Sequence, residues 1–203
     1  MTLGGCTILA VEGTHAAGKT TLVHALAAHY GAVGVQVATV EEPARSRPFI
    51  DDIVMRGKGD FDLVTQVDLF AAQLVGQIRH ARGRRLLIAD KTIANVLAYA
   101  RIFVDHQSGG HDEAVLAAMQ QFCQAWAGVY DAVFLCQDHF DATVPGDPYR
   151  SRVQRLQRVA HSSVQAAIVD TGHRVFNIPA GFDLTSRVAW VVSQVDQAGL
   201  LSG

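Results

Sequence analysis

A glycine-rich segment near the N-terminus carries the clearest chemistry in the sequence. Residues 13–20 fit the pattern G-x-x-x-x-G-K-[ST], follow an apolar run of strand length and lead directly into a helical pattern. Glycines let the backbone aim successive N–H groups inward, and the helix adds its positive N-terminal end, so the segment predicts a phosphate-binding loop. We expect Lys19 to reach the β- and γ-phosphates of a nucleotide and the Thr20 hydroxyl to ligate Mg²⁺. The predicted nucleotide-binding residues are Gly13, Thr14, His15, Ala16, Ala17, Gly18, Lys19, Thr20 and Thr21.

Carboxylates and an arginine follow the second apolar run, at residues 35–40. Glu42 is the predicted base for a hydroxyl that attacks a γ-phosphate and would contact that acceptor, with Glu41 as the alternative. Arg45 would steady charge on the transferring group. The competing interpretation is a solvated acidic turn stiffened by Pro43.

The third apolar run, at residues 86–89, ends in an acid and a lysine. Asp90 is predicted to hold Mg²⁺-bound water opposite Thr20, and Lys91 to offer its charge to donor or acceptor phosphates. Alternatively, Asp90 caps the helix that follows.

A run of arginines later in the chain could form a lid over the phosphates. Arg150, Arg152, Arg155 and Arg158 lie at helical spacing, so they could close on the triphosphate, and Arg150 and Arg152 are the predicted catalytic pair. The alternative is a solvated basic helix face.

For an acceptor, the second helix carries Gln66 and Gln73 seven residues apart with Phe70 between them. Amides could read a base edge while the aromatic ring stacks on it, although Phe70 could equally belong to the core.

These residues need a scaffold that brings strand ends together. Apolar runs alternate with stretches of helical period, which is typical of an α/β fold with a parallel sheet and right-handed crossovers. The carboxyl ends of the strands then meet at one edge, where ligands bind. Helices are predicted at 19–30 and, behind an Asp183 N-cap, at 184–198. The predicted strands are 6–11, 35–40, 86–89, 132–135 and 175–178.

Composition narrows the classes of protein. The 203 residues are 49% hydrophobic with a net charge of −2, which indicates one domain over 1–203 and no nucleic-acid partner. No signal peptide or membrane-length apolar run is evident, so we expect a cytoplasmic protein without membrane contact. Three cysteines at unrelated spacings indicate reduced thiols. A guanine-reading Asn-Lys-x-Asp sequence is missing, which disfavours a GTPase.

The chain resembles the P-loop nucleoside and nucleotide kinases, including thymidylate kinases, deoxynucleoside kinases and the nicotinamide riboside kinase type. The similarity lies in the phosphate loop, Leu69-Phe70-Ala71-Ala72, Asp90-Lys91-Thr92 and Glu42-Pro43. It implies a three-layer P-loop NTPase fold with helices on both faces of a five-stranded sheet of order 2-3-1-4-5, a helical lid at about 145–160, and ATP as donor. The related enzymes hold adenine through the backbone at the place of Pro179, Ala180 and Gly181.

Two departures from thymidylate kinases bear on the acceptor. Gln73-Leu74 replaces an Asp-Arg pair whose arginine grips a monophosphate, and Lys91 replaces an arginine. Both favour a nucleoside or similar small hydroxyl compound, phosphorylated with ATP and Mg²⁺, and a homodimer is possible. A nucleoside monophosphate kinase, a kinase of another small molecule such as an antibiotic, and a regulatory ATP-binding switch remain alternatives.

Overall fold

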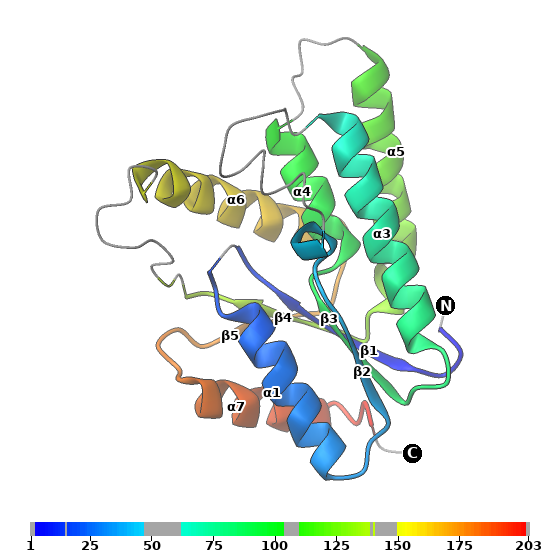
Figure 1. Cartoon of the computed structure of the whole chain (residues 1–203), viewed down its shortest axis with the longest axis vertical. Coiled ribbons are helices and arrows are strands. Elements are labelled where there is room, and N and C mark those ends of the chain that lie inside the picture. The colour runs from blue at the N-terminus through cyan, green and yellow to red at the C-terminus, as the bar shows by residue number, and fades with distance from the viewer. Residues whose placement is uncertain are drawn as a thin grey trace.

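A parallel sheet forms the centre of the chain (Figure 1). The computed structural model describes residues 3–14, 16–46, 62–103, 110–138, 140 and 150–201, and only the backbone at 45–46, 103, 110 and 150–158. The strand order is β2-β3-β1-β4-β5, as predicted, and every pair is parallel. The strands are β1 (Thr7–Glu12), β2 (Val37–Val40), β3 (Leu86–Asp90), β4 (Ala132–Cys136) and β5 (Val175–Ile178).

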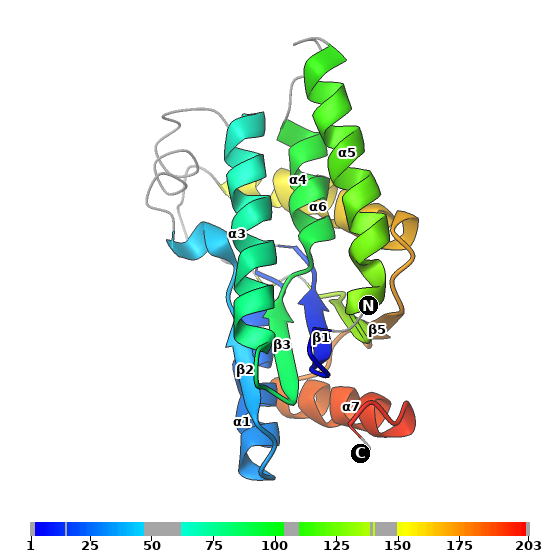
Figure 2. The same ribbon diagram turned by 90° about the vertical axis from the view of Figure 1, so that its right-hand side faces the viewer.

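Helices cover both faces of the sheet, which gives the predicted three layers. Helices α1 and α7 lie on one face, and α3, α4, α5 and α6 lie on the other (Figures 1 and 2). The helices are α1 (Lys19–Ala32), α3 (Leu63–Ala81), α4 (Ile93–Phe103), α5 (Gly110–Trp126), α6 (Arg150–Asp170) and α7 (Leu184–Gln197), with 3-10 turns η1 (Pro43–Ser46) and η2 (Ala127–Val129).

Local hydrogen bonds explain where elements begin. Asp183 caps α7 as predicted, because its carboxylate accepts a hydrogen bond from the Ser186 N–H at 2.8 Å. Strand β2 begins two residues later than predicted. The Val35 N–H donates to the Tyr30 carbonyl at 3.0 Å, so residue 35 closes the C-terminal turn of α1 instead of joining the sheet.

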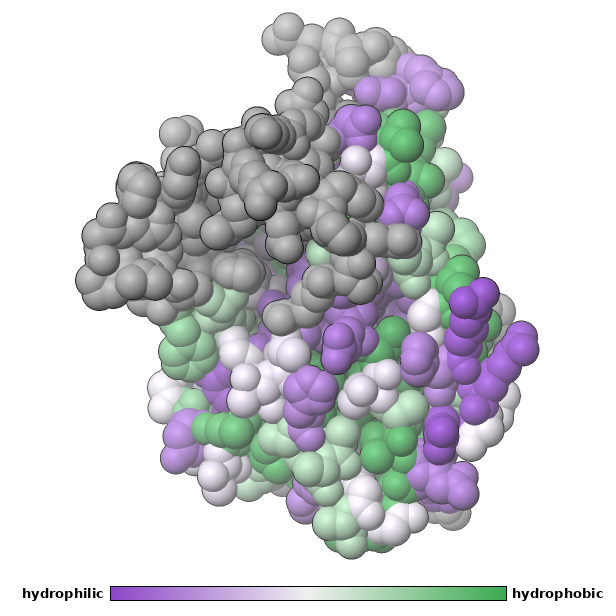
Figure 3. Space-filling view, viewed as in Figure 1, coloured by the Kyte–Doolittle hydropathy of each residue, from purple (hydrophilic) through white to green (hydrophobic). Residues whose placement is uncertain are grey.

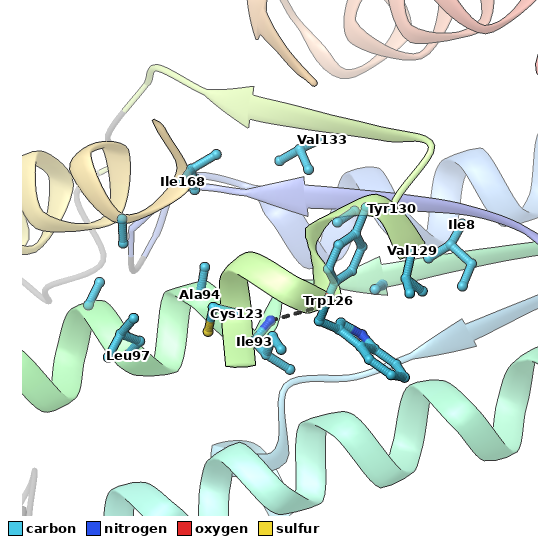
Figure 4. Close-up of a cluster of buried hydrophobic side chains, with 14 of the residues drawn as sticks. Ile8, Ile93, Ala94, Leu97, Cys123, Trp126, Val129, Tyr130, Val133 and Ile168 are labelled. Carbon is cyan, nitrogen blue, oxygen red and sulfur yellow. Dashed lines mark hydrogen bonds between the residues drawn. The ribbon is translucent and has the colours of Figure 1, made fainter. Parts of the chain in front are cut away.

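Successive side chains of a strand point to opposite faces of the sheet, and this divides the hydrophobic core into two clusters. In β1, Ile8 and Ala10 face the α3–α6 side, whereas Leu9 and Val11 face α1 and α7. Figure 4 shows the first side, where the Tyr130 hydroxyl accepts a hydrogen bond from the Ile93 N–H at 3.1 Å. The apolar runs of the three central strands, β1, β3 and β4, are therefore buried on both faces, whereas the edge strands β2 and β5 are only partly buried.

The structure bears on two predictions made from the composition, which concern the cysteine thiols and membrane-spanning helices. Cys6, Cys123 and Cys136 are free and buried, and burial raises the pKa of the Cys123 thiol to about 12. Among the described residues, no helix has both the length and the apolar character to cross a bilayer. Hydrophilic and hydrophobic residues are intermixed over the α1 and α7 part of the surface in Figure 3.

Candidate active site

The phosphate loop connects β1 to α1 and requires glycine at two positions. Gly13 and Gly18 have φ values of 140° and 77°, which favour glycine. A Cβ atom on Gly13 would lie 3.1 Å from the Cys136 carbonyl oxygen, and one on Gly18 would lie 3.1 Å from Nη1 of Arg187. The loop is therefore held close to β4 and to α7, and a side chain at either glycine would be strained by its φ and crowded by these neighbours.

Lys19 is buried at the start of α1, with only 5% of its surface exposed. Its ammonium donates to the Thr14 carbonyl oxygen at 2.6 Å across the loop. Burial and the nearby Lys91 charge lower its pKa, against opposing effects of Asp90, Glu42 and Glu12. A phosphate in the loop would offer this cation the countercharge that favours its protonated form.

Thr20 and Asp90 have the arrangement expected of a Mg²⁺ site. The Thr20 hydroxyl donates to Oδ2 of Asp90 at 2.5 Å, and the Asp90 side chain is fully buried. Its other oxygen, Oδ1, has no hydrogen-bond partner among the described residues. A buried carboxylate oxygen with a spare acceptor position fits a Mg²⁺-bound water.

The capping alternative for Asp90 has less support. At the start of α4 the Thr92 N–H donates to Oε1 of Glu12 at 2.6 Å, and the Ile93 N–H donates to Tyr130. Both N–H groups are thus bound by other residues.

Glu42 and Lys91 form an ion pair at the ends of neighbouring strands. Lys91 is 6% exposed and its ammonium lies 5.1 Å from the centroid of the Tyr99 ring. Burial alone would lower the Lys91 pKa, but the carboxylate of Glu42, with Tyr99 and Asp90, raises it above its usual value. Glu41 is exposed, whereas Glu42 is partly buried at this edge, so Glu42 has the better position for the predicted base.

The backbone of Lys91 is held in an unusual conformation by side chains of α3. Its φ is 83°, in the left-handed region that non-glycine residues rarely adopt. The Lys91 carbonyl accepts hydrogen bonds from Nε2 of Gln73 at 2.8 Å and of Gln77 at 3.2 Å. Gln77 in turn accepts a bond from the Tyr130 hydroxyl at 2.8 Å. This network fixes the cation that faces Glu42.

The network changes the interpretation of the two predicted acceptor glutamines. The Gln73 amide N–H groups bind backbone carbonyls, so its first role is to support Lys91. Gln66 and Gln73 are each 1% exposed, and Oε1 of each has no hydrogen-bond partner in the described part of the chain. These two acceptors remain candidates for ligand contacts.

Phe70 lies in helix packing. Its ring meets the Phe122 ring of α5 edge-on at a centroid distance of 5.8 Å, and its side chain packs against the α3–α6 core. The structure thus favours the core alternative over stacking on an acceptor, because the ring is directed toward a neighbouring helix.

Glu12 is a buried carboxylate to which the sequence interpretation gave no role. It accepts hydrogen bonds from the Thr92 hydroxyl at 2.7 Å and from Nδ2 of Asn95 at 2.7 Å, besides the Thr92 N–H. Burial raises its pKa, although these bonds act in the opposite direction. Glu12 therefore ties the end of β1 to the start of α4. An acid at the end of an apolar run was the available signal.

The sequence interpretation also assigned no role to Arg187, because this residue of α7 lies far along the chain from Ala17 and Asp138, which it contacts. It is 3% exposed and bonds three carbonyl or carboxylate groups, those of Ala17, Phe182 and Asp138. Asp138 also accepts a hydrogen bond from the Gly181 N–H at 3.0 Å. The predicted adenine loop, which includes Pro179 and Ala180, is thereby linked to the phosphate loop.

The remaining predicted residues lie at the start of α1, in η1 and at the start of α6. Thr21 is exposed, next to Thr20. Arg45 is in η1, and Arg150 and Arg152 begin α6, but the side chains of all three lie outside the described residues, as do His15 and residues 145–149 of the predicted lid. The backbone of the rest of the lid, residues 150–160, forms the start of α6.

Solved structures with a similar fold include NadR, thymidylate kinases and a deoxyadenosine kinase. NadR protein in complex with NR has a TM-score of 0.68 at 14% identity, over 97% of this chain and 53% of NadR, so the chain spans about half of that protein. Thymidylate kinase from Ehrlichia chaffeensis has a TM-score of 0.63 at 15% identity, over 94% and 99% of the two chains. Deoxyadenosine kinase from M. mycoides with bound dATP has 0.64 at 13%, over 93% and 98%.

The sequence comparisons gave fewer matches than the structural comparison. No curated protein matches the chain significantly. A family of AAA domains does match, over residues 9–184, a span that starts in β1 and ends at the first residue of α7. Because this match covers most of the sequence and contains the phosphate loop, the chain belongs to the AAA domain family AAA_28.

Proposed function

We propose that this protein is an ATP- and Mg²⁺-dependent kinase that phosphorylates a hydroxyl of a nucleoside or nucleoside-like small molecule. The observation that carries the proposal is the Glu42–Lys91 ion pair, which lies at the sheet edge that also holds Lys19, Thr20 and Asp90. A carboxylate held beside the transfer site by a buried cation suits deprotonation of an attacking hydroxyl. Water is such a nucleophile too, so the ion pair fits a nucleotide-hydrolysing switch as well, and the kinase is favoured over the switch by the neighbouring structures and tested by acceptor dependence.

The proposed reaction assigns a role to each of these groups. Glu42 accepts the proton of the acceptor hydroxyl, whose oxygen attacks the γ-phosphorus while the bond from that phosphorus to the β–γ bridging oxygen breaks and ADP leaves. Lys19 and the N–H groups of the loop offset charge on the phosphates. Thr20 and Asp90 would hold Mg²⁺, which when bound neutralises phosphate charge. Arg45, Arg150 and Arg152 are proposed to add positive charge as the lid closes.

Two features support a nucleoside as acceptor. Leu74, at the position where thymidylate kinases have an arginine, packs its side chain against the α3–α6 core. Gln66 offers a buried Oε1 that could accept a hydrogen bond from a base. Two of the neighbouring structures are a deoxyadenosine kinase and NadR in complex with NR. The competing candidate is a monophosphate kinase, because two other neighbours are thymidylate kinases.

A panel assay of ADP release tests the proposal. Each nucleoside is compared with its own 5′-monophosphate at the same ATP and Mg²⁺ concentrations, with an acceptor-free reaction as background. We expect acceptor-dependent ADP release and a higher kcat/KM for nucleosides, by about 10- to 100-fold, because a phosphate entering without a charged partner loses a strong hydrogen bond. ADP release that is independent of any acceptor would favour the switch. Better turnover of monophosphates, lost in Arg45→Ala, would favour a nucleotide kinase.

A further inference from the structure

Arg187 joins three loops that are far apart in the sequence. Its Nη1 donates to the Ala17 carbonyl at 3.0 Å, its Nε to the Phe182 carbonyl at 3.0 Å, and its Nη2 to Oδ2 of Asp138 at 2.7 Å. These acceptors lie in the phosphate loop, after β5 and after β4 respectively. A guanidinium is suited to this task, since it presents five donors in a rigid plane.

The hydrogen bond to the Ala17 carbonyl also affects the direction of the Gly18 N–H, which belongs to the same peptide bond. In a trans peptide the C=O of one residue and the N–H of the next point in opposite directions. When Arg187 draws the Ala17 carbonyl outward, the Gly18 N–H is therefore aimed away from Arg187, toward the interior of the loop. N–H groups aimed into such a loop are the groups that bind phosphate oxygens.

The preceding peptide bond is held in the same way. The Phe140 N–H donates to the Ala16 carbonyl at 2.9 Å, which turns the Ala17 N–H inward. Ala16 has a φ of 57°, a conformation that a non-glycine residue keeps only with support from its surroundings. The centroid of the Phe140 ring lies 5.1 Å from the Arg187 guanidinium carbon, so the two residues that hold these carbonyls pack against each other.

We infer that Arg187, held by Asp138, is a positioning residue that orients the phosphate-binding N–H groups of the loop. The inference rests on the proposed use of ATP but adds to it, because it concerns a residue whose hydrogen bonds go to protein groups behind the loop. It differs from a role in holding the base. Through Asp138, Arg187 also reaches the Gly181 N–H, so a role through the predicted adenine loop is the competing explanation.

The two explanations are separated by a ligand without a base. ATP and inorganic tripolyphosphate are titrated, each with Mg²⁺, into the wild type and into Arg187→Gln by calorimetry. We expect affinity for both ligands to fall by a similar factor, about 10- to 100-fold, because misdirected N–H groups lose charge-assisted hydrogen bonds. Unchanged tripolyphosphate affinity in the folded variant, with or without a loss for ATP, would overturn the inference.

Further variants serve as replicate and control. Asp138→Asn keeps the shape but weakens the hold on Arg187, so it should reduce both affinities in the same proportion, and it replaces Arg187→Gln if that variant does not fold. Arg174→Gln is the matched control, because Arg174 is an exposed arginine beside Phe176 at the other end of β5. A wild type that binds neither ligand would instead reject the proposed function itself, and the inference with it.

Discussion

The Asp90→Asn substitution tests whether the Asp90 carboxylate serves Mg²⁺ binding or protein stability. In the wild type this carboxylate is buried, and only one of its two oxygens has a hydrogen-bond partner among the described residues. The substitution keeps the volume, and the asparagine Oδ1 can still accept the Thr20 hydroxyl bond, now without charge assistance. That loss is about 1 kcal/mol. Removal of the carboxylate, whose second oxygen has no partner in the described structure, relieves a desolvation penalty of at least similar size, but it also removes an attraction to the buried Lys19 and Lys91 ammonium groups. Because these effects oppose one another, we expect the free energy of unfolding without Mg²⁺ to change by less than about 3 kcal/mol.

The same change should weaken Mg²⁺ binding. Loss of a partner that acts through metal-bound water typically reduces metal affinity by about 10- to 100-fold, which corresponds to about 1.4 to 2.7 kcal/mol. The Mg²⁺ concentration for half-maximal binding of a fluorescent ATP analogue should increase by this factor. Denaturant unfolding in EDTA supplies the stability measurement.

Glu41→Gln is the matched control for this experiment. It removes an exposed carboxylate from the same sheet edge and should change neither quantity. The reasoning is refuted if Asp90→Asn has the wild-type Mg²⁺ midpoint. It is also refuted if the variant loses more than about 3 kcal/mol of stability in EDTA, since the charge would then be structural.

Three further predictions concern Lys19, Glu42 and Glu12. Lys19→Ala should abolish ADP release while the unfolding temperature holds or rises, since burial disfavours this ammonium; normal turnover in the folded variant would contradict the phosphate-loop assignment. Glu42→Gln should lower kcat by about 10²- to 10⁴-fold with a smaller change in acceptor KM, and a larger loss in Glu41→Gln would move the base by one residue. Burial raises the Glu12 pKa, so wild-type stability should fall by up to about 1.4 kcal/mol per pH unit as pH rises above about 4.3 toward the folded-state pKa. Glu12→Gln removes this slope, and parallel urea titrations that show equal slopes would mean that Glu12 stays ionised throughout.

The strands and the phosphate loop were readable in the sequence because both depend on local patterns. Apolar runs buried on both faces give strands, and a fixed glycine spacing gives the loop. The strand order followed from the family resemblance, and the structure has the same order.

The hydrogen bonds that support Lys91 and Arg187 could not be predicted from the sequence, because they join residues far apart in the chain. A seven-residue spacing puts Gln66 and Gln73 on one helix face but does not show how deeply that face is buried. The left-handed φ of Lys91 has no sequence signal, since lysine does not favour it. Pairing of Arg187 with Asp138 spans 49 residues, and no local rule predicts it.

The bond from Arg187 to Ala17 also bears on the order of events during synthesis. The phosphate loop is made early, but its brace lies 170 residues later in the chain. At about 5 to 20 residues per second, the ribosome adds that arginine about 10 to 30 s after the loop. A nascent chain that stops before α7 would carry the whole glycine-rich motif without the contact that orients it. If Arg187 orients the loop as inferred, nucleotide binding would report that synthesis has passed α7, and a fragment stalled before α7 would bind nucleotide weakly.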